Sequence, residues 1–184
     1  MHKPPYRQEN GNWLIELRLG SPRQLFNTID PAPFHEKDLD EAAERYIVGA
    51  VENFPDGTPL QLQLHLPEEF RNQETREQLS TALHNYFGWR SEETRRDLAR
   101  LLRDGRISLV IGLSFLVFCT VTRQLTVHYT DGMVTHLFDE GLLIIGWVAL
   151  WRPIQTFLYD WWPIRRRLHT LRRVARLASE LHIP

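Results

Sequence analysis

Two uncharged, strongly apolar stretches constrain the fold of this 184-residue chain more than any other feature. The first covers residues 107–122, ISLVIGLSFLVFCTVT, and the second covers residues 141–151, GLLIIGWVALW. Arginines precede the first stretch and follow the second, namely Arg100, Arg103 and Arg106 and then Arg165, Arg166 and Arg167. Because Lys and Arg accumulate on the cytoplasmic side of membrane proteins, this pattern predicts an α-helical transmembrane hairpin with both termini in the cytoplasm.

Charge is segregated along the chain, which indicates several regions rather than one globule. Residues 1–90 hold 9 basic and 14 acidic side chains, whereas residues 152–184 hold 7 basic and 2 acidic side chains. The predicted regions are a cytosolic α/β head (1–90), a connecting helix (91–106), a two-span membrane hairpin (107–162) with an extracytoplasmic loop (123–138), and a basic amphipathic tail helix (163–184). The first residues are polar and lack the apolar core of a signal peptide, so we expect the head to stay in the cytosol.

The hydrophobic pattern of the head predicts a small β-α-β-α fold. Residues 13–19 and 60–66 alternate between apolar and polar side chains, which is typical of half-buried strands. Residues 39–54 carry apolar side chains at helical spacing, and Asp38 is the expected N-cap. A strand-helix-strand unit favours parallel strands. Further helices are predicted over 72–87, ended by Gly88, and over 92–103, capped by Ser91.

A two-stranded sheet leaves both of its edges open. Either a further strand lies within residues 20–37, or the edges pair with a second copy, and the second alternative predicts a homo-oligomer. Assembly is then expected through Leu62 and Leu64 in the head and through the small-residue pair Ser108 and Gly112 in the first span. The apolar side chains of the segment 20–37 predict either a cap over the core or a partner-binding loop.

The predicted spans are short. Residues 107–122 would form about 24 Å of helix, against a hydrocarbon core of about 30 Å. Residues 124–137 alternate on both sides of an Asp-Gly pair, which predicts a β-hairpin, although two helices extended to a tight turn fit the same residues. The second span is expected to begin at Asp139 and Glu140, since acidic residues favour a helix N-terminus.

Arg152 follows the second apolar stretch directly. It is expected near the cytoplasmic interface, where its guanidinium reaches lipid phosphate or pairs with Asp160, among the Trp and Tyr residues of an aromatic belt. Pro153 is expected to kink the helix. Because intramembrane charges often serve transport, Arg152, Asp139 and Glu140 also support an alternative function, a subunit of a small oligomeric channel or transporter.

The tail combines apolar side chains at helical spacing with arginines on the remaining face, which is typical of a helix on a membrane surface. The predicted contacts to anionic lipids or to an acidic partner are Arg165, Arg166, Arg167, Arg172, Arg173 and Arg176. Nucleic-acid binding is not expected, because the tail lacks the aromatic residues on which bases stack.

Residues with possible metal chemistry occur in two places. His35, Glu36, Asp38 and Asp40 cluster before the first helix, where acidic residues are ordinary. His128 and His136 would face each other across the loop, as a surface pair or as a weak metal site or pH sensor. Neither set has the spacing of an established metal motif, and no nucleotide-binding or nucleophile motif occurs. We therefore expect no catalytic residue, no cofactor and no metal.

Residues 25–47, LFNTIDPAPFHEKDLDEAAERYI, and 140–166, EGLLIIGWVALWRPIQTFLYDWWPIRR, together resemble an uncharacterised bacterial membrane protein family with a small cytosolic head and a two-helix anchor. The resemblance covers about two thirds of the chain and implies the bacterial inner membrane, but no activity. The leading hypothesis is therefore a non-enzymatic, membrane-anchored oligomeric scaffold or adaptor with a possible cytosolic protein partner.

Overall fold

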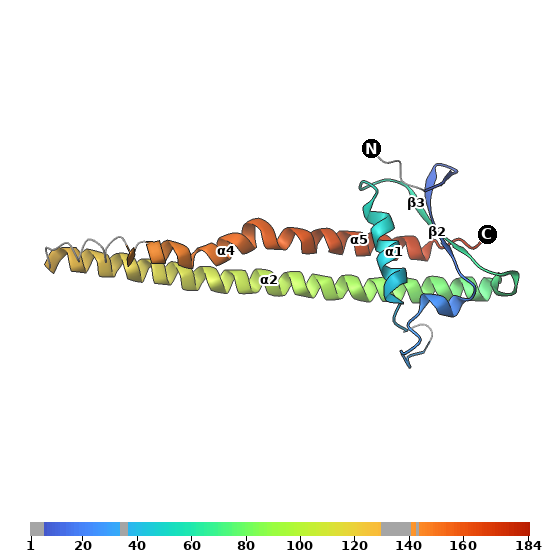
Figure 1. Cartoon of the computed structure of the whole chain (residues 1–184), viewed down its shortest axis with the longest axis horizontal. Helices are drawn as coiled ribbons and strands as arrows, with labels where there is room; N and C mark the ends of the chain where they lie inside the picture. Colours follow the sequence, from blue (N-terminus) through green and yellow to red (C-terminus); the bar gives the residue numbers. More distant parts are fainter. Residues whose placement is uncertain (1–5, 34–36, 130–140, 143) are drawn as a thin grey trace. The chain divides into compact units, whose positions relative to one another are not determined.

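The computed structural model of the chain is mostly helical, with one small three-stranded sheet and one long helix that contains the first apolar stretch (Figure 1). It describes residues 6–33, 37–129, 141–142 and 144–184, without the side chains of 126–129. The chain forms two compact units. Unit 1 comprises Met1–Thr94 with Arg167–Pro184, and unit 2 comprises Arg95–Arg166.

The sheet of unit 1 contains β1 (Gln8–Glu9), β2 (Asn12–Arg18) and β3 (Leu60–His65), in that order. β2 and β3 pair in parallel with Trp13 opposite Leu60, as the strand-helix-strand pattern predicted. β1 was not predicted, and it pairs antiparallel with β2. The turn between them is Asn10-Gly11, and both residues have positive φ, 49° and 84°. This is the backbone that a two-residue β-hairpin requires and that Asn-Gly adopts most readily.

The connection between the parallel strands is α1 (Glu41–Glu52), which buries Ile47, Ala50 and Val51. Its N-cap is Asp40, whose carboxylate accepts hydrogen bonds from the backbone N–H groups of Ala42 and Ala43 at 2.9 and 3.3 Å. The predicted cap, Asp38, is therefore wrong by two residues. Either aspartate can cap a helix, and the backbone pairing of Phe26 with Leu39 sets where this helix begins.

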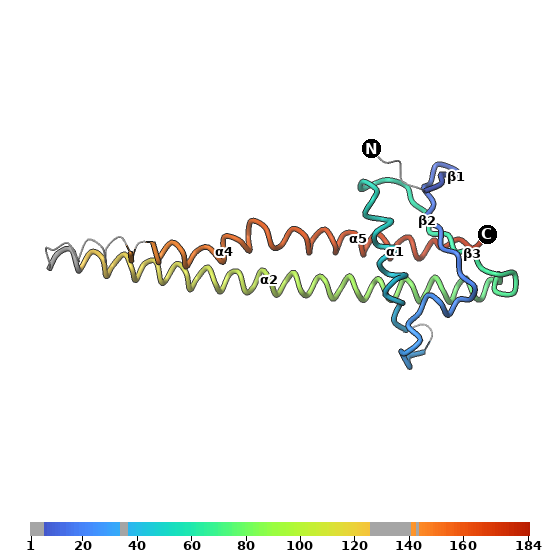
Figure 2. Tube along the Cα trace, viewed as in Figure 1, coloured from blue at the N-terminus to red at the C-terminus, as the bar shows by residue number. Residues whose placement is uncertain are grey.

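Both edges of the β2–β3 pair are occupied within the chain, which corrects the expectation of two open edges. β1 covers the outer edge of β2, and the C-terminal segment runs along β3 (Figure 2). There, the N–H of Leu64 donates to the carbonyl of His182 at 2.9 Å, and the N–H of His182 donates to the carbonyl of Leu62 at 3.0 Å. Neither added segment lies in residues 20–37, where the sequence suggested a further strand.

The segment 20–37 instead contributes to the core of unit 1 from a short helix and the bridge that follows it. η1 (Pro22–Leu25) precedes that bridge, and Leu25 and Phe26 are buried. Ile29 points outward and is 87 % exposed. Leu25 and Phe26 thus cover the core, as the first of the two alternatives predicted, whereas Ile29 does not contribute to the core.

The C-terminal helix α5 (Trp161–Ser179) corrects the prediction of a separate tail. Its residues 167–179 belong to unit 1, where Leu171, Val174 and Ala178 lie in the same core as the strands. Ser80 donates to the carbonyl of Ala178 at 2.8 Å, which ties the helix further to its unit. An apolar stripe at helical spacing suits a protein core and a membrane surface equally, so the spacing alone did not distinguish them.

The long helix α2 (Gln73–Tyr129) spans 57 residues and contributes to both units. It passes through Gly88 and Ser91 without interruption, so the predicted break there is wrong. A glycine inside a helix costs only about 1 kcal/mol, which tertiary packing readily offsets. Residues 124–129 are also helical, which excludes the first strand of the predicted β-hairpin; residues 130–137 lie outside the described residues.

Replacing Leu171, 1 % exposed, by Ala should destabilise unit 1 by about 2–5 kcal/mol, because the change leaves a cavity in the core. Native-state hydrogen exchange of the β3 amides in detergent measures this loss. Arg172→Ala, on the exposed side of the same helix, is the matched control and should change stability by less than about 0.5 kcal/mol. Equal effects of the two substitutions would contradict the placement of this helix in the core.

Candidate functional site

Within unit 2, α2 contacts the returning helical segment at three glycines. A carbon atom added to Gly105 would lie 2.8 Å from Cγ2 of Thr156, and one added to Gly112 would lie 2.9 Å from the carbonyl oxygen of Ala149. On the returning segment, a carbon added to Gly146 would lie 2.8 Å from Cδ1 of Leu116. Contact positions rise along α2 as they fall along the returning segment, so the two run antiparallel. A side chain at Gly112 would meet backbone, whereas one at Gly105 or Gly146 would require the facing side chain to shift.

These contacts define a seam with a seven-residue repeat on α2. Gly105, Gly112 and Cys119 are buried and occupy equivalent positions of the repeat. The returning segment buries Gly146, Leu150, Pro153 and Thr156. A seven-residue repeat keeps one face of a helix on its partner, and small residues on that face let the backbones approach closely. Gly112, predicted to join copies of the chain, here packs within a single chain.

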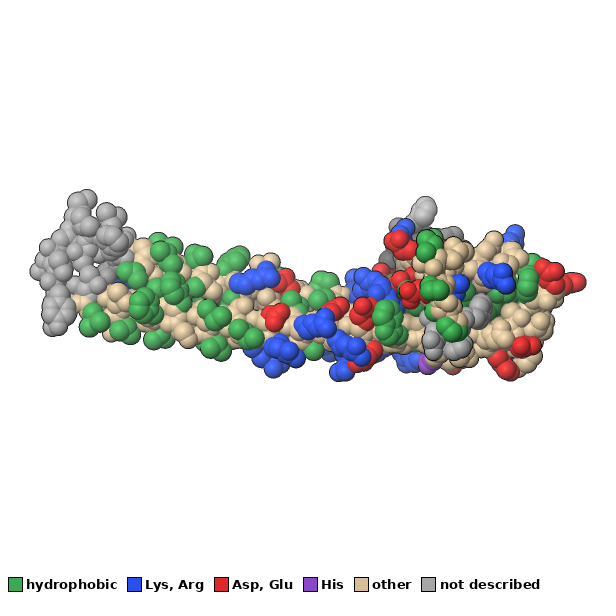
Figure 3. All heavy atoms as spheres, turned by 90° about the horizontal axis from the view of Figure 1, so that it is seen from below, with side chains coloured by type: hydrophobic (Ala, Val, Ile, Leu, Met, Phe, Trp, Pro, Cys, Tyr) green, Lys and Arg blue, Asp and Glu red, His purple; other side chains and the backbone are tan. Residues whose placement is uncertain are grey.

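The outer surface of unit 2 is apolar. Among the described residues of unit 2, the large hydrophobic side chains that are at least 39 % exposed are Ile107, Val110, Ile111, Leu113, Phe115, Val117, Phe118, Val121, Leu125, Ile144, Ile145, Trp147, Val148, Trp151, Ile154, Leu158, Tyr159 and Trp162. Figure 3 shows such hydrophobic side chains, in green, over the surface of the apolar segment. Small residues inside and large apolar residues outside are the reverse of a water-soluble helical pair.

Among the described residues, one helix is long and apolar enough to cross a membrane. An 18-residue window of Gln73–Leu125 has a mean hydropathy of 1.8, and 17 % of that window is buried. The outward apolar side chains on α2 extend from Ile107 to Leu125, about 27 Å of helix, which is close to the hydrocarbon thickness of about 30 Å. The continuation of α2 beyond residue 122 thus removes most of the shortfall that the uncharged stretch suggested.

Exposed arginines and aromatic residues occur where the apolar surface of unit 2 ends. Arg103 and Arg106 flank Gly105 on α2 and are exposed, and the contact of Gly105 with Thr156 places them level with residues 155–158. On the returning segment, Arg152 and Arg165 are exposed as well, about one turn to one side of this level and about two turns to the other side. We name Arg103, Arg106, Arg152 and Arg165 the arginine collar. The guanidinium of Arg165 lies 5.5 Å from the ring centre of Trp161, a cation–π contact.

The returning segment changes helix type just after Pro153. α4 (Trp151–Gln155) is followed by η3 (Thr156–Asp160), a π-helical turn that leads into α5. Proline lacks the N–H that an α-helix needs at that position, and a π-turn is one way to accommodate the disturbance. The hydroxyl of Thr156 donates to the carbonyl of Arg152 at 3.1 Å. The salt bridges of the described residues do not include the suggested pair of Arg152 and Asp160.

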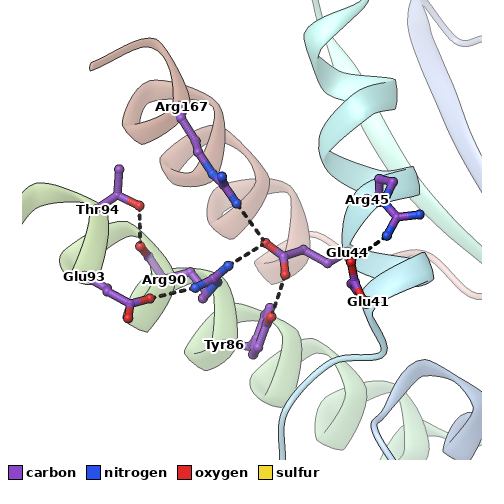
Figure 4. Close-up of polar contacts among 8 residues, drawn as sticks. All are labelled: Glu41, Glu44, Arg45, Tyr86, Arg90, Glu93, Thr94 and Arg167. Atoms are coloured by element: carbon purple, nitrogen blue, oxygen red, sulfur yellow. Dashed lines mark hydrogen bonds and ion pairs between the residues drawn. The ribbon is translucent and has the colours of Figure 1, made fainter. Parts of the chain in front are cut away.

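Unit 1 contains a polar cluster around Glu44 that joins α1, α2 and α5 (Figure 4). The Glu44 side chain is 13 % exposed and accepts a hydrogen bond from the Tyr86 hydroxyl at 2.8 Å. Its other oxygen lies 3.3 Å from Arg90 and 3.7 Å from Arg167. Burial, followed by the hydrogen bond to Glu44, raises the pKa of Tyr86. The cluster therefore holds a protonated phenol and a paired carboxylate, an arrangement that stabilises helix packing.

The six arginines predicted to contact lipid occupy different environments. Arg165 belongs to the collar, and Arg166, Arg172 and Arg176 are exposed. Arg167 lies against Glu44. Arg173 is only 8 % exposed, and its guanidinium donates to the carbonyls of Phe54 and Thr58 at 3.3 and 2.7 Å. The Arg173 side chain therefore forms its hydrogen bonds inside unit 1.

The remaining predicted site residues divide into buried, half-buried and undescribed positions. Leu62 and Leu64 are 1 % and 0 % exposed, so they face the core and not a joining surface. Ser108 is half-buried beside the seam. The following lie outside the described residues: His35, Glu36, His136, Asp139, Glu140 and the side chain of His128. No group of three His, Cys, Asp or Glu in the part of the chain that the structure describes could hold a metal ion.

A polar groove of about 430 Å³ on unit 1 was not predicted from the sequence. Its lining includes Gln61, Gln63 and His65 of β3 and Glu16 of β2. His65 Nε2 lies 3.0 Å from Glu16 Oε1, and Gln63 is 7 % exposed. The alternation along β3 already placed polar side chains on one face; the parallel register brought Glu16 beside them.

Comparisons of the chain with protein-family models, curated proteins and solved structures gave no match. The resemblance of residues 25–47 and 140–166 to a membrane family therefore stays a prediction. Function has to be inferred from the geometry described above.

The close packing of the seam predicts how a larger side chain at one of its glycines changes the accessibility of Cys119. Gly146→Leu should force the two helical segments apart and expose Cys119, which is 2 % exposed and is the only cysteine of the chain. The rate of labelling by N-ethylmaleimide in detergent should rise by on the order of tenfold or more, since a 1.4 kcal/mol change in an opening equilibrium is a factor of ten. Trp147→Leu, at an outward position, is the matched control and should leave the rate unchanged. Slow labelling of both variants would show that the glycines do not set the helix distance.

The Glu44 cluster predicts that removing the buried carboxylate of Glu44 destabilises unit 1 more than removing an exposed carboxylate on the same helix. Glu44→Ala leaves Tyr86 and Arg90 without their shared acceptor and should cost unit 1 about 1–3 kcal/mol. Glu41→Ala removes a carboxylate that is 87 % exposed from the same helix turn and should cost less than about 0.5 kcal/mol. Hydrogen exchange of the α1 amides compares the two variants. A Glu44 variant as stable as the Glu41 variant would mean that the cluster does not stabilise the packing.

Proposed function

We propose that the chain is a non-enzymatic, membrane-anchored scaffold, in which unit 2 is a two-helix transmembrane hairpin and unit 1 is a small α/β head presented at the membrane surface. The observation that carries the proposal is the inverted distribution of side chains in unit 2. Glycines line its seam, and 18 large apolar side chains among its described residues point outward.

The energetic cost of exposing these side chains to water supports a membrane location. Fully burying one large apolar side chain stabilises a protein by about 1.5–3 kcal/mol, so 18 partly exposed ones amount to on the order of 20 kcal/mol. The free energy of unfolding of a soluble domain is only about 5–15 kcal/mol, which is less than this cost of exposing the apolar side chains to water. Water is therefore a poor solvent for this surface. Lipid solvates it, and helical backbones satisfy their own hydrogen bonds there.

The flanking arginines support the proposed topology. They lie on one side of both apolar stretches, so both termini and unit 1 are proposed to be cytoplasmic. The bacterial inner membrane is the proposed location, supported by the sequence resemblance alone. Anionic lipids are the proposed partners of the exposed arginines of unit 2.

A scaffold is favoured over a channel or transporter because the seam of a single chain is closed. Close contacts at Gly105, Gly112 and Gly146 hold the two helical segments together over the described length of the seam, which disfavours a polar path between them. In unit 1, Glu44 and Arg173 are engaged in holding its elements together. Assembly of copies remains part of the proposal, now through the apolar outer faces of unit 2, because the sheet edges are occupied.

Fractionation of cells that express the full chain tests the proposal. The protein should stay in the membrane pellet after alkaline carbonate, and reporters fused at Met1 and at Pro184 should both report the cytoplasm. Val117→Asp combined with Phe118→Asp should abolish stable insertion, because a charge at the centre of a span costs about 2.5–3.5 kcal/mol. Tyr46→Asp combined with Trp89→Asp, at exposed positions of unit 1, is the matched control and should stay membrane-bound.

Two results would contradict the anchor. Extraction of the unmodified chain by carbonate would show a peripheral or soluble protein. Opposite readings of the two reporters would show that only one segment crosses the membrane.

A further inference from the structure

The exposed apolar side chains of unit 2 end at different points on its two helical segments. On α2, Ile107 is the first of the outward apolar side chains, and the exposed Arg103 and Arg106 directly precede it. On the returning segment, Tyr159 and Trp162 are 67 % and 63 % exposed and close the apolar surface. The contact of Gly105 with Thr156 places Ile107 level with about residue 154, so the apolar surface continues for about two turns further on the returning segment, alongside Arg103 and Arg106.

The collar carries an excess of positive charge there. Four arginines belong to it, and two acidic residues, Asp104 and Asp160, lie near them in the sequence. Within the described ranges, none of the four forms a salt bridge with a carboxylate, whereas the nearby Arg100 lies 3.5 Å from Asp97. A guanidinium at the boundary of an apolar surface binds phosphate oxygens well, because its N–H groups form charge-assisted hydrogen bonds in a planar fork.

We propose that the arginine collar binds the phosphate of net-anionic phospholipids and thereby sets the depth of unit 2 in the bilayer. This inference rests on the proposed membrane anchor. Phosphatidylglycerol and phosphatidylcholine carry the same phosphodiester, but choline adds a positive charge that the collar repels. Tyr159 and Trp162 lie at the depth where amphipathic rings favour the headgroup region.

The collar differs from the lipid-binding set that periodicity predicted. Arg167 and Arg173 of that set are held by Glu44 and by backbone carbonyls in unit 1. Arg103, Arg106 and Arg152 replace them: Arg103 and Arg106 directly precede the outward apolar surface of α2, and Arg152 lies about one turn from Arg106 across the seam. Arg172 and Arg176, exposed on unit 1, provide a matched comparison of equal charge.

Native mass spectrometry of the full chain in detergent, titrated with phosphatidylglycerol or phosphatidylcholine, tests the inference. Phosphatidylglycerol should bind with higher occupancy. Arg103→Gln combined with Arg106→Gln should weaken its binding by about 25-fold, since each basic residue near an anionic membrane surface is worth about fivefold. Arg172→Gln combined with Arg176→Gln should leave the occupancy unchanged. Unchanged labelling of Cys119 would confirm that both variants keep the seam.

Three results would overturn the inference: equal occupancy of the two lipids, equal losses in the two double variants, or displacement of phosphatidylglycerol by millimolar inorganic phosphate, which would indicate a site for free phosphate. Carbonate extraction separates this failure from failure of the anchor. A chain that resists extraction but shows no lipid preference overturns the collar alone, whereas a chain that is extracted overturns both.

Discussion

The close approach of two helical backbones at Gly105, Gly112 and Gly146 is the contact on which the organisation of unit 2 depends. Because these positions have no side chain, the backbones approach closely and Leu116 and Leu150 pack against them, while most of the large side chains are directed outward. That outward surface needs an apolar solvent. The glycine contacts thus connect a local steric fact to the proposed location of the protein in a membrane.

Unit 1 obtains its stability from segments that are distant in the sequence. The strands alone would form a two-stranded sheet with little buried area, but β1, α2, α5 and the C-terminal segment complete it. The backbone pairing of His182 with β3 and the Glu44 cluster both require residues beyond 166. A head built from residues 1–90 alone would therefore lack part of its core and one occupied sheet edge.

Some features that the sequence analysis did not predict have a recognisable sequence pattern, and others have none. The hairpin of β1 and β2 could have been found, because Asn10-Gly11 is a strong turn signal. The glycine seam also had a signal, since Gly105, Gly112 and Cys119 repeat every seven residues. The continuity of α2 through Gly88 had none, because a glycine is compatible with both a helix end and a helix interior. Burial of Arg173 had none either, since its carbonyl partners lie more than a hundred residues away.

The sequence by itself determined the two strands, the helix between them and their parallel pairing, because side-chain periodicity and connection length act locally. It also determined that one segment is apolar enough to span a membrane. Only the tertiary structure decided which apolar face of a helix meets protein and which faces outward, because that depends on contacts between residues far apart in the chain. The tail shows the difference: its periodic apolar face suited a membrane surface and a core equally, and packing against Leu79, Leu83 and Phe87 placed it in the core.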